Sequence, residues 1–299
     1  MNRALLISFI SFFILSGCFD IDNDKKTKDR SYRSKRNVKV DYSKPYLERR
    51  KNFKTKLSRK GPAPQEWEEE DLLPGVEQFY YKSGKLKLKA WLYAADKTKQ
   101  NKAIVYFHGG FASSMYDMIL MQPFIDAGFV VLCPALRGEN GNPGHFELFL
   151  GEVDDARAAI KMLAKKSYVD EDHIYAFGHS AGGGISSLLS LFNDLPLKHT
   201  GACGGLYDAS TFRYWNDFRP FPYNDLENSV RAFVENIRHM KFKHHSFIGR
   251  NDYGIKVNID KADKERKEHN IKFLKLYYTK GDHLSSLEPA IKAYLKLCK

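Results

Sequence analysis

The chain has 299 residues, 43% of them hydrophobic, which is enough for one large core or two modest ones. Its formal net charge of +12 is concentrated near the N-terminus, because residues 18–60 carry 16 Lys and Arg against 6 Asp and Glu. Residues 61–299 carry 31 basic and 30 acidic side chains. This near balance removes the compositional argument for nucleic-acid binding by the folded part, so we expect no nucleic-acid partner.

The first seventeen residues have the pattern of a secretory signal peptide. Asn2 and Arg3 form a short positive segment, and Ala4–Leu15 is an apolar run of twelve residues. A run of this length is too short to span a bilayer comfortably, which favours a cleaved signal peptide over a permanent anchor. We expect residues 1–17 to be this signal peptide; an uncleaved anchor is the alternative.

The apolar run ends in Leu15-Ser16-Gly17-Cys18, which resembles the lipobox of bacterial lipoproteins. This resemblance implies that Cys18 is lipidated, that it begins the mature chain, and that the protein is held at a membrane of the cell envelope. Phe19, rather than Asp, at the next position implies the outer membrane by the same analogy. The alternative is an ordinary signal peptide without lipidation.

Residues 18–65 are polar, basic and nearly without aliphatic periodicity, so we expect a disordered tether between the lipid and the folded domain. A tether of this kind needs only to be a soluble spacer. The alternative is an electrostatic contact with anionic lipid headgroups or envelope polymers.

From residue 66 onwards, segments typical of strands and of helices alternate. This alternation predicts one α/β domain over residues 66–299, with a mostly parallel sheet covered by helices on both faces. Residues 208–240 are an irregular, aromatic-rich insertion, which is either a cap over an apolar pocket or core packing. The predicted strands are 76–82 and 86–93 (a hairpin turned at Ser83-Gly84), 103–107, 129–133, 174–177, 201–206, 245–249 and 271–278, and the predicted helices are 116–127, 153–163, 257–270 and 287–297, besides one directly after residue 180.

The most informative stretch is the apolar run Ile174–Phe177 followed by Gly178-His179-Ser180-Ala181-Gly182 and further small residues. A strand, a tight turn and a helix with Ser at the turn form the arrangement known as a nucleophile elbow. The glycines fit this interpretation because only a missing Cβ lets strand and helix pack so closely around a strained turn. Ser180 is therefore the candidate nucleophile.

A serine hydroxyl needs a base to take its proton and an acid to orient that base. The best acid after Ser180 is Asp252, in a polar loop directly after the strand over 245–249; Asp208, Asp225 and Asp260 are further from predicted strand ends. Among ten histidines, His283 lies in the loop after the last strand and is the candidate base. We interpret His179, next to the nucleophile, as structural or as pocket lining.

An oxyanion formed during such a reaction needs backbone N–H donors. One is expected from Ala181, the residue after the nucleophile. The other is expected from the loop His108-Gly109-Gly110-Phe111, which follows the strand over 103–107 and whose glycines let the backbone face a substrate. Gly110 is the preferred donor and Phe111 the second choice.

Neither a metal ion nor a cofactor is expected. His and Cys do not show the spacing of metal ligands, and Gly182-Gly183-Gly184 lacks the Lys-Ser/Thr of a phosphate-binding loop. With Cys18 lipidated, three cysteines remain, which cannot close a disulfide framework. We interpret Cys133, Cys203 and Cys298 as small buried hydrophobic residues.

Over residues 75–299 the chain resembles the prolyl oligopeptidase family, in particular the hydrolase domains of acylaminoacyl and dipeptidyl peptidases. This resemblance implies an α/β-hydrolase fold and a triad of Ser180, Asp252 and His283. The matching pieces are His108-Gly-Gly-Phe111, Leu136-Arg-Gly138, Gly178-His-Ser-Ala-Gly-Gly183, Gly249-x-x-Asp252 and Gly281-Asp-His283.

The chain departs from that family in one respect that bears on substrate. The related peptidases usually carry a large N-terminal β-propeller, whereas only about sixty residues, mostly tether, precede the hydrolase domain in this sequence. The expected activity is therefore that of a serine hydrolase acting on a small-molecule or peptide acyl substrate, as a peptidase or an esterase. The alternative is a non-catalytic envelope lipoprotein that uses the hydrolase fold for binding.

Overall fold

The computed structural model describes residues 40–51 and 53–299. The predicted signal peptide over 1–17, the lipidation site Cys18 and the tether over 18–39 lie outside the described residues. Within the part that is described, no helix has the length and apolar character needed to cross a membrane.

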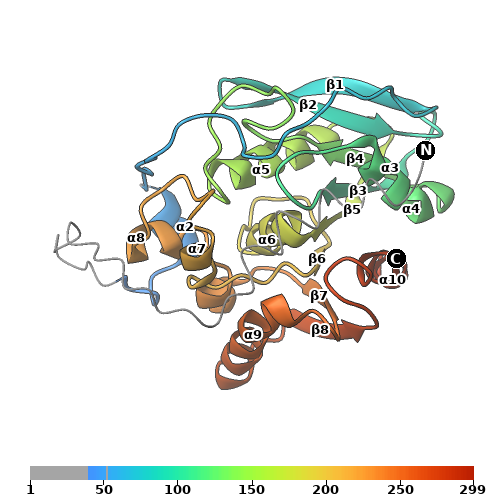
Figure 1. The fold of residues 1–299 in the computed structure, drawn as a ribbon. Coiled ribbons are helices and arrows are strands. Elements are labelled where there is room, and N and C mark those ends of the chain that lie inside the picture. Colours follow the sequence, from blue (N-terminus) through green and yellow to red (C-terminus); the bar gives the residue numbers. More distant parts are fainter. Residues whose placement is uncertain (1–39, 52) are drawn as a thin grey trace.

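An eight-stranded sheet forms the centre of the domain (Figure 1). Its strand order is β1-β2-β4-β3-β5-β6-β7-β8, and the pairs from β4 to β8 are parallel, while β1 and β2 are antiparallel additions at one edge. The predicted mostly parallel sheet is thereby confirmed. The strands are β1 (Val76–Ser83), β2 (Leu86–Tyr93), β3 (Asn101–Phe107), β4 (Val130–Pro134), β5 (Val169–His179), β6 (His199–Cys203), β7 (His244–Gly249) and β8 (Leu274–Thr279).

Helices cover both faces of the sheet, as the sequence predicts (Figure 1). The helices are α2 (Tyr46–Lys51), α3 (Met115–Leu120), α4 (Gln122–Asp126), α5 (Gly151–Leu163), α6 (Ser180–Leu189), α7 (Thr211–Tyr214), α8 (Asp225–Ser229), α9 (Lys256–Glu268) and α10 (Leu287–Leu295), with 3₁₀ helices η1 (Val234–His239) and η2 (Tyr253–Ile255).

Strand β3 shows how side-chain alternation builds the two layers. Successive side chains of a strand point to opposite faces. Ala103, Val105 and Phe107 join one hydrophobic cluster, which includes residues of α5, α6 and α9. Ile104 and Tyr106 join the other cluster, with α3, α4 and α10. Every side chain of β3 from residue 103 to 107 is buried, which explains the continuous apolar run in the sequence.

The helix predicted over 116–127 is two short helices, α3 and α4, that meet at Met121. Pro123 lies in the first turn of α4. A proline lacks the N–H that a continuous helix would need and its ring clashes with the preceding turn, whereas the first turn of a new helix tolerates it. The proline therefore ends one helix and begins the next.

The folded domain begins earlier than predicted. The sequence predicts that residues 40–65 belong to the tether, but helix α2 lies within them, beside α7 and α8 (Figure 1). The Tyr46 side chain is only 1% exposed, and its hydroxyl donates a hydrogen bond of 2.9 Å to the carbonyl of Val230. Arg50 donates to the carbonyl of Leu150 at 2.7 Å and pairs with Asp154. The predicted boundary at residue 66 is therefore wrong.

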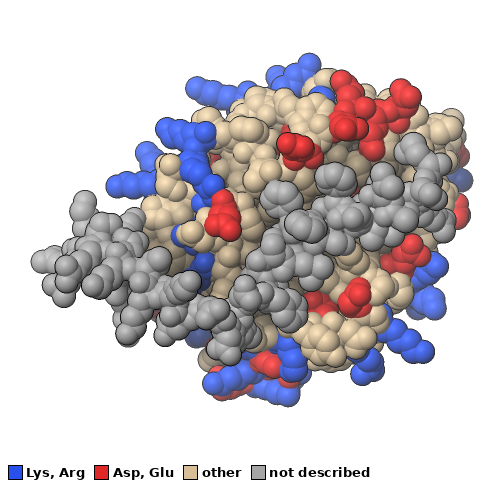
Figure 2. Space-filling view, viewed as in Figure 1, with Lys and Arg blue, Asp and Glu red and all other residues tan. Residues whose placement is uncertain are grey.

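The surface of the domain carries both charge signs. In Figure 2, Lys and Arg gather at the upper left, Asp and Glu gather at the upper right, and both signs lie along the lower edge. Both signs are expected, because basic and acidic side chains are nearly equal in number over residues 61–299.

Cys133, Cys203 and Cys298 are buried and free, as the sequence predicts.

Candidate active site

The elbow at the end of β5 has the backbone strain that the motif requires. Ser180 has a φ of 50°, in the left-handed region that non-glycine residues seldom adopt. A Cβ on Gly178 would lie 2.1 Å from the carbonyl oxygen of Gly182, and one on Gly182 would lie 2.1 Å from that of Phe107. Only glycine fits both positions, so β5, α6 and the end of β3 pack backbone against backbone around Ser180.

Asp252 and His283 lie together at the same edge of the sheet as Ser180. Asp252 follows β7 and His283 follows β8, two neighbouring parallel strands. The Nδ1 atom of His283 is 2.7 Å from Oδ2 of Asp252, which is 6% exposed. The Nε2 atom of His283 is buried and has no hydrogen-bond partner within residues 40–51 and 53–299. The structure therefore brings Asp252 and His283 together but shows no hydrogen bond between Nε2 of His283 and Ser180.

His179 links the elbow to the loop that carries His283. Its Nε2 is 2.8 Å from the carbonyl oxygen of His283, and the two rings stand 5.1 Å apart. Burial first, and the charge on His283 second, lower the pKa of His179 to about 3. The neutral ring then donates from Nε2 to that carbonyl, which fits the predicted structural role of this residue.

The predicted oxyanion donors directly follow two neighbouring strands, Ala181 after β5 and Gly110 after β3. Ala181 is in the first turn of α6, where backbone N–H groups have no partner within the helix. Gly110 has a φ of 73°, which glycine adopts readily. Both residues line one small cavity of about 10 Å³, comparable with a single water molecule. The N–H of Phe111 donates to the side-chain oxygen of Gln65 at 2.8 Å.

A buried ion pair supports the loop that carries Gly110. The Nε2 atom of His108 is 3.0 Å from Oε2 of Glu139, which also accepts the N–H of Leu136. Burial alone would lower the pKa of His108, but the charge of Glu139 and this hydrogen bond raise it to about 9. The charged imidazole also donates from Nδ1 to the carbonyl of Gly109, so the pair fixes the first residues of the loop.

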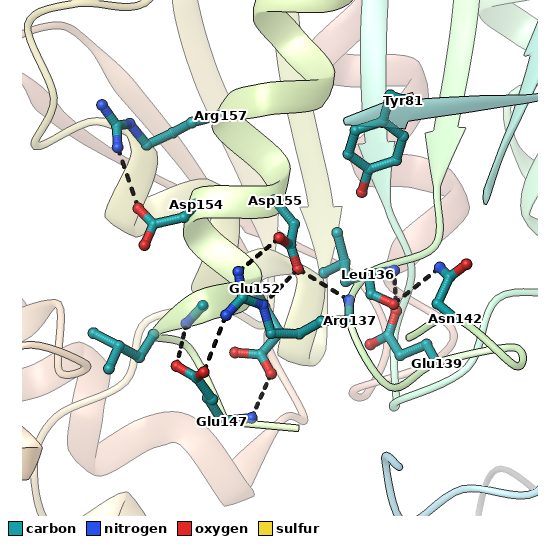
Figure 3. A network of polar contacts seen from close by, with 12 residues as sticks. Tyr81, Leu136, Arg137, Glu139, Asn142, Glu147, Glu152, Asp154, Asp155 and Arg157 are labelled. Carbon is teal, nitrogen blue, oxygen red and sulfur yellow. Dashed lines mark hydrogen bonds and ion pairs between the residues drawn. The ribbon is translucent and has the colours of Figure 1, made fainter. Parts of the chain in front are cut away.

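Arg137 holds the segment between β4 and α5 in place (Figure 3). Its guanidinium donates 2.8 Å hydrogen bonds to both carboxylate oxygens of Asp155, which is fully buried, and pairs with Glu147 at 3.0 Å. Two parallel bonds of this kind are stronger and more directional than one. Since Glu139 lies in the same segment, this network indirectly supports the His108 pair.

Glu152 lies at the cavity next to Gly110 and Ala181. One of its oxygens accepts the N–H of Glu147 at 2.6 Å, and the other is buried without a partner in the described part of the chain. Burial raises the pKa of Glu152 to about 8 in spite of the positive charge of Arg137. The proton held in the folded state contributes stability that is complete below pH 4.5 and is lost as the pH rises through about 8.

Tyr207, the residue directly before the insertion, lies next to the candidate nucleophile, and aromatic side chains of the insertion pack on Tyr207 and Phe111. The hydroxyl oxygen of Tyr207 is 3.5 Å from Oγ of Ser180, and its ring stacks on Phe149 and contacts Trp215. Phe218 packs on Phe111 at 5.2 Å. Other aromatic residues of the insertion, such as Phe212 and Phe221, are fully buried. Within the insertion, some rings therefore pack in the core and others border the site.

Three features of the site were missed by the sequence analysis: the contact of Gln65 with Phe111, the His108–Glu139 pair and the approach of Tyr207 to Ser180. Each joins residues at least 27 positions apart. The one sequence signal near these contacts was the motif Leu136-Arg137-Gly138, which lies in the segment after β4.

Ser180, Asp252 and His283 lie at one edge of the sheet. Their catalytic roles remain predictions.

One group of possible metal ligands lies on α9. Glu265, Glu268 and His269 place their ligand atoms within 4.8 Å of one another, at an exposed or half-exposed surface. His269 and Glu265 form a 3.4 Å ion pair that accounts for part of this closeness. The group is outside the site described above and does not bear on its chemistry.

The family assignment comes from a comparison with protein-family models. Residues 115–243 match the model of the prolyl oligopeptidase family. The matched stretch, which is less than half of the chain, is similar to this family. The match includes the elbow with Ser180, whereas Asp252 and His283 lie beyond its end. The predicted family resemblance is thereby confirmed.

Two curated proteins match part of the chain. It is 34% identical over 113 residues to the uncharacterized peptidase YtmA of Bacillus subtilis (strain 168), which is 37% of this chain and 44% of the relative. It is 29% identical over 141 residues to the uncharacterized protein YcjY of Escherichia coli (strain K12), which is 46% of this chain and 42% of that protein. The chain thus spans less than half the length of the curated relatives it matches.

Solved structures share the fold. An esterase of Pyrococcus furiosus superposes with a TM-score of 0.62 at 17% identity, covering 80% of this chain and 97% of the esterase. The acylaminoacyl peptidase of Pyrococcus horikoshii gives 0.59 at 18% identity, covering 75% of this chain and 40% of the peptidase. At these identities the likeness shows the α/β-hydrolase fold alone, which confirms the predicted fold class.

Proposed function

We propose that this protein is a serine hydrolase that cleaves an ester or amide bond through an acyl-enzyme. The observation that carries the proposal is the 2.7 Å hydrogen bond between Asp252 and His283, at the sheet edge where the strained elbow presents Ser180. The match of residues 115–243 to the prolyl oligopeptidase family, which includes this elbow, supports the same activity.

In the proposed reaction, Oγ of Ser180 attacks the carbonyl carbon of the substrate and its proton passes to Nε2 of His283. Asp252 keeps the imidazole in the required tautomer and stabilises the imidazolium. The N–H groups of Ala181 and Gly110 donate to the oxyanion. His283 then protonates the leaving alcohol or amine, and a water molecule, deprotonated by the same histidine, releases the acid from Ser180.

The substrate class that we propose is an acyl compound, either a peptide or a small ester. Both kinds of enzyme occur among the structures that share the fold, since one is an esterase and another an acylaminoacyl peptidase. The alternative is a non-catalytic binding protein. A hydrolase site that has lost its activity normally lacks a member of the triad, whereas Ser180, Asp252 and His283 are all present in this sequence.

A fluorophosphonate probe tests the proposed activity, because it reacts with the activated serine of a serine hydrolase. The wild-type protein is expected to be labelled, and digestion followed by mass spectrometry is expected to locate the label on the peptide with Ser180. Heat-unfolded protein serves as the control, since activation needs the folded site. No labelling of the folded protein, where a known serine hydrolase is labelled, would contradict the proposal.

We further propose that the protein is a lipoprotein held at the cell envelope through Cys18. The lipobox-like sequence that ends in this cysteine supports the proposal. Expression in a bacterium supplied with a labelled fatty acid is expected to label the wild type and to place it in the membrane fraction. Cys18→Ala should lose both. Equal labelling of the two proteins would show that Cys18 is not the lipidated residue.

A further inference from the structure

Residues 53–70, which we call the strap, cross the edge of the sheet where Ser180 lies. In Figure 1 the strap is the blue segment that leads from α2 towards β1. It begins at the insertion, where Lys56 N–H donates to Glu227 at 2.9 Å and Ser58 N–H donates to the carbonyl of Pro220 at 2.7 Å. The strap is therefore attached at one end to the insertion that follows β6.

The middle and the end of the strap contact two further loops of the same sheet edge. Ala63 N–H donates to the carbonyl of Gly138 at 2.9 Å, and Gly61 accepts from Phe146 N–H at 3.0 Å, both in the segment after β4. The carboxylate of Glu70 accepts the N–H of Met115. The strap thus joins the loops that follow β3, β4 and β6, which together surround the candidate site.

Gln65 extends from the strap to the predicted oxyanion donors. Its Oε1 accepts the N–H of Phe111 at 2.8 Å. The same oxygen would lie only 2.3 Å from a Cβ on Gly110, so it also lies against that residue. Gly110 and Phe111 are the two candidates for the second oxyanion donor. A carboxamide oxygen is chemically the same kind of acceptor as the carbonyl oxygen of an amide substrate.

The rest of the site agrees with a closed state. Ser180 is 5% exposed, and the cavity beside Gly110 and Ala181 holds little more than a water molecule. A substrate that places its carbonyl oxygen at the N–H of Phe111 needs the space that Oε1 of Gln65 occupies. Gln65 is itself only half-buried, so its side chain can leave without opening the core.

We propose that Gln65 competes with the substrate for the oxyanion donor of the loop at Gly110 and Phe111, and that a substrate must displace the Gln65 side chain to react. This inference rests on the proposed function. Because only conformers with Gln65 displaced bind substrate, the apparent affinity is lowered by the fraction of molecules in that state. Gln65 therefore weakens substrate binding without taking part in the chemical step, and it selects for substrates whose carbonyl competes well with a carboxamide.

The test compares four full-length proteins: wild type, Gln65→Ala, Gln65→Glu and Gln78→Ala. Gln78 is an exposed glutamine of β1 and serves as the matched control. The second-order rate constant for labelling by a small fluorophosphonate is measured for each, with KM and kcat for a short p-nitrophenyl ester. Loss of one hydrogen bond changes the equilibrium between the bound and the displaced Gln65 side chain by about 3- to 10-fold.

Gln65→Ala is expected to be labelled about 3- to 10-fold faster than wild type, with KM lowered by a similar factor and kcat unchanged. Gln65→Glu keeps an acceptor, and a carboxylate accepts more strongly than an amide, so it should be labelled no faster than wild type. Gln78→Ala should match wild type.

If Gln65 instead supports the loop at Phe111, Gln65→Ala should be labelled more slowly than wild type. If Gln65→Ala is folded by its melting temperature and labelled at the wild-type rate or more slowly, the inference is wrong while the proposed function stands. If none of the four proteins is labelled, the proposed function fails and the inference with it. Labelling of Gln65→Ala alone would support both.

Discussion

Replacing Ser180 by alanine is expected to lower kcat for an activated ester about 10⁶-fold, a magnitude typical of removing the nucleophile of a serine hydrolase. The hydroxyl that forms the acyl-enzyme is lost, whereas the backbone conformation is retained, because alanine and serine tolerate the φ of 50° at this position about equally. Steady-state turnover of a p-nitrophenyl ester by purified Ser180→Ala measures the loss.

The control for this change is Ser167→Ala, at an exposed serine between α5 and β5, which should turn over substrate at the wild-type rate. Both variants should unfold within a few degrees of the wild type in a circular dichroism melt. Turnover by Ser180→Ala at more than a hundredth of the wild-type rate, after repeated purification, would mean that another residue is the nucleophile.

The sheet and the placement of Ser180, Asp252 and His283 at one edge of it could be predicted because their signals are local. A strand buried on both faces, such as β3, appears as a continuous apolar run. The elbow needs glycine at positions fixed relative to Ser180, since Gly178 and Gly182 contact backbone atoms where a Cβ would not fit. Asp252 and His283 each follow directly after a recognisable strand, and parallel neighbouring strands bring such loops to one edge.

The start of the domain could not be predicted because its contacts are distant in sequence. Residues 40–65 are polar and basic, and composition of this kind normally indicates a segment without a core. Tyr46 nevertheless reaches a carbonyl 184 positions away, and Arg50 reaches one 100 positions away. Single buried side chains produce no periodic pattern in the sequence. A domain start predicted from composition therefore lies too far along the chain.

The electrostatic support of the site was missed for the same reason. His108 was recognised only as the first residue of a glycine-containing loop, and its partner Glu139 is 31 positions away. The pair is buried on both sides, with His108 5% and Glu139 3% exposed. A histidine or a glutamate in isolation carries no sequence signal of such a pairing, whereas the structure shows that it fixes the loop to which Gly110 belongs.

Replacing Asp252 by asparagine is expected to lower kcat about 10⁴-fold, as the loss of a triad carboxylate does elsewhere. Asparagine has nearly the same shape, but its amide can donate to Nδ1 of His283 and so favours the tautomer with a proton on Nε2. That proton blocks the acceptor which the Ser180 hydroxyl needs. The neutral amide also fails to stabilise the imidazolium that forms during the reaction. The rate of ester hydrolysis by Asp252→Asn measures the effect.

Asp260→Asn is the matched control, because Asp260 lies exposed on α9 and pairs only with Lys256 in the described residues. It should keep the wild-type kcat. If kcat of Asp252→Asn instead falls by less than about tenfold, another acid must orient His283, and its 2.7 Å contact with Asp252 would be structural.

Because hydroxide can assist a base in the wrong tautomer, we expect the difference in kcat between wild type and Asp252→Asn to shrink at high pH. An equal deficit at every pH would indicate a distorted site rather than a lost carboxylate, so the pH profile separates the two causes.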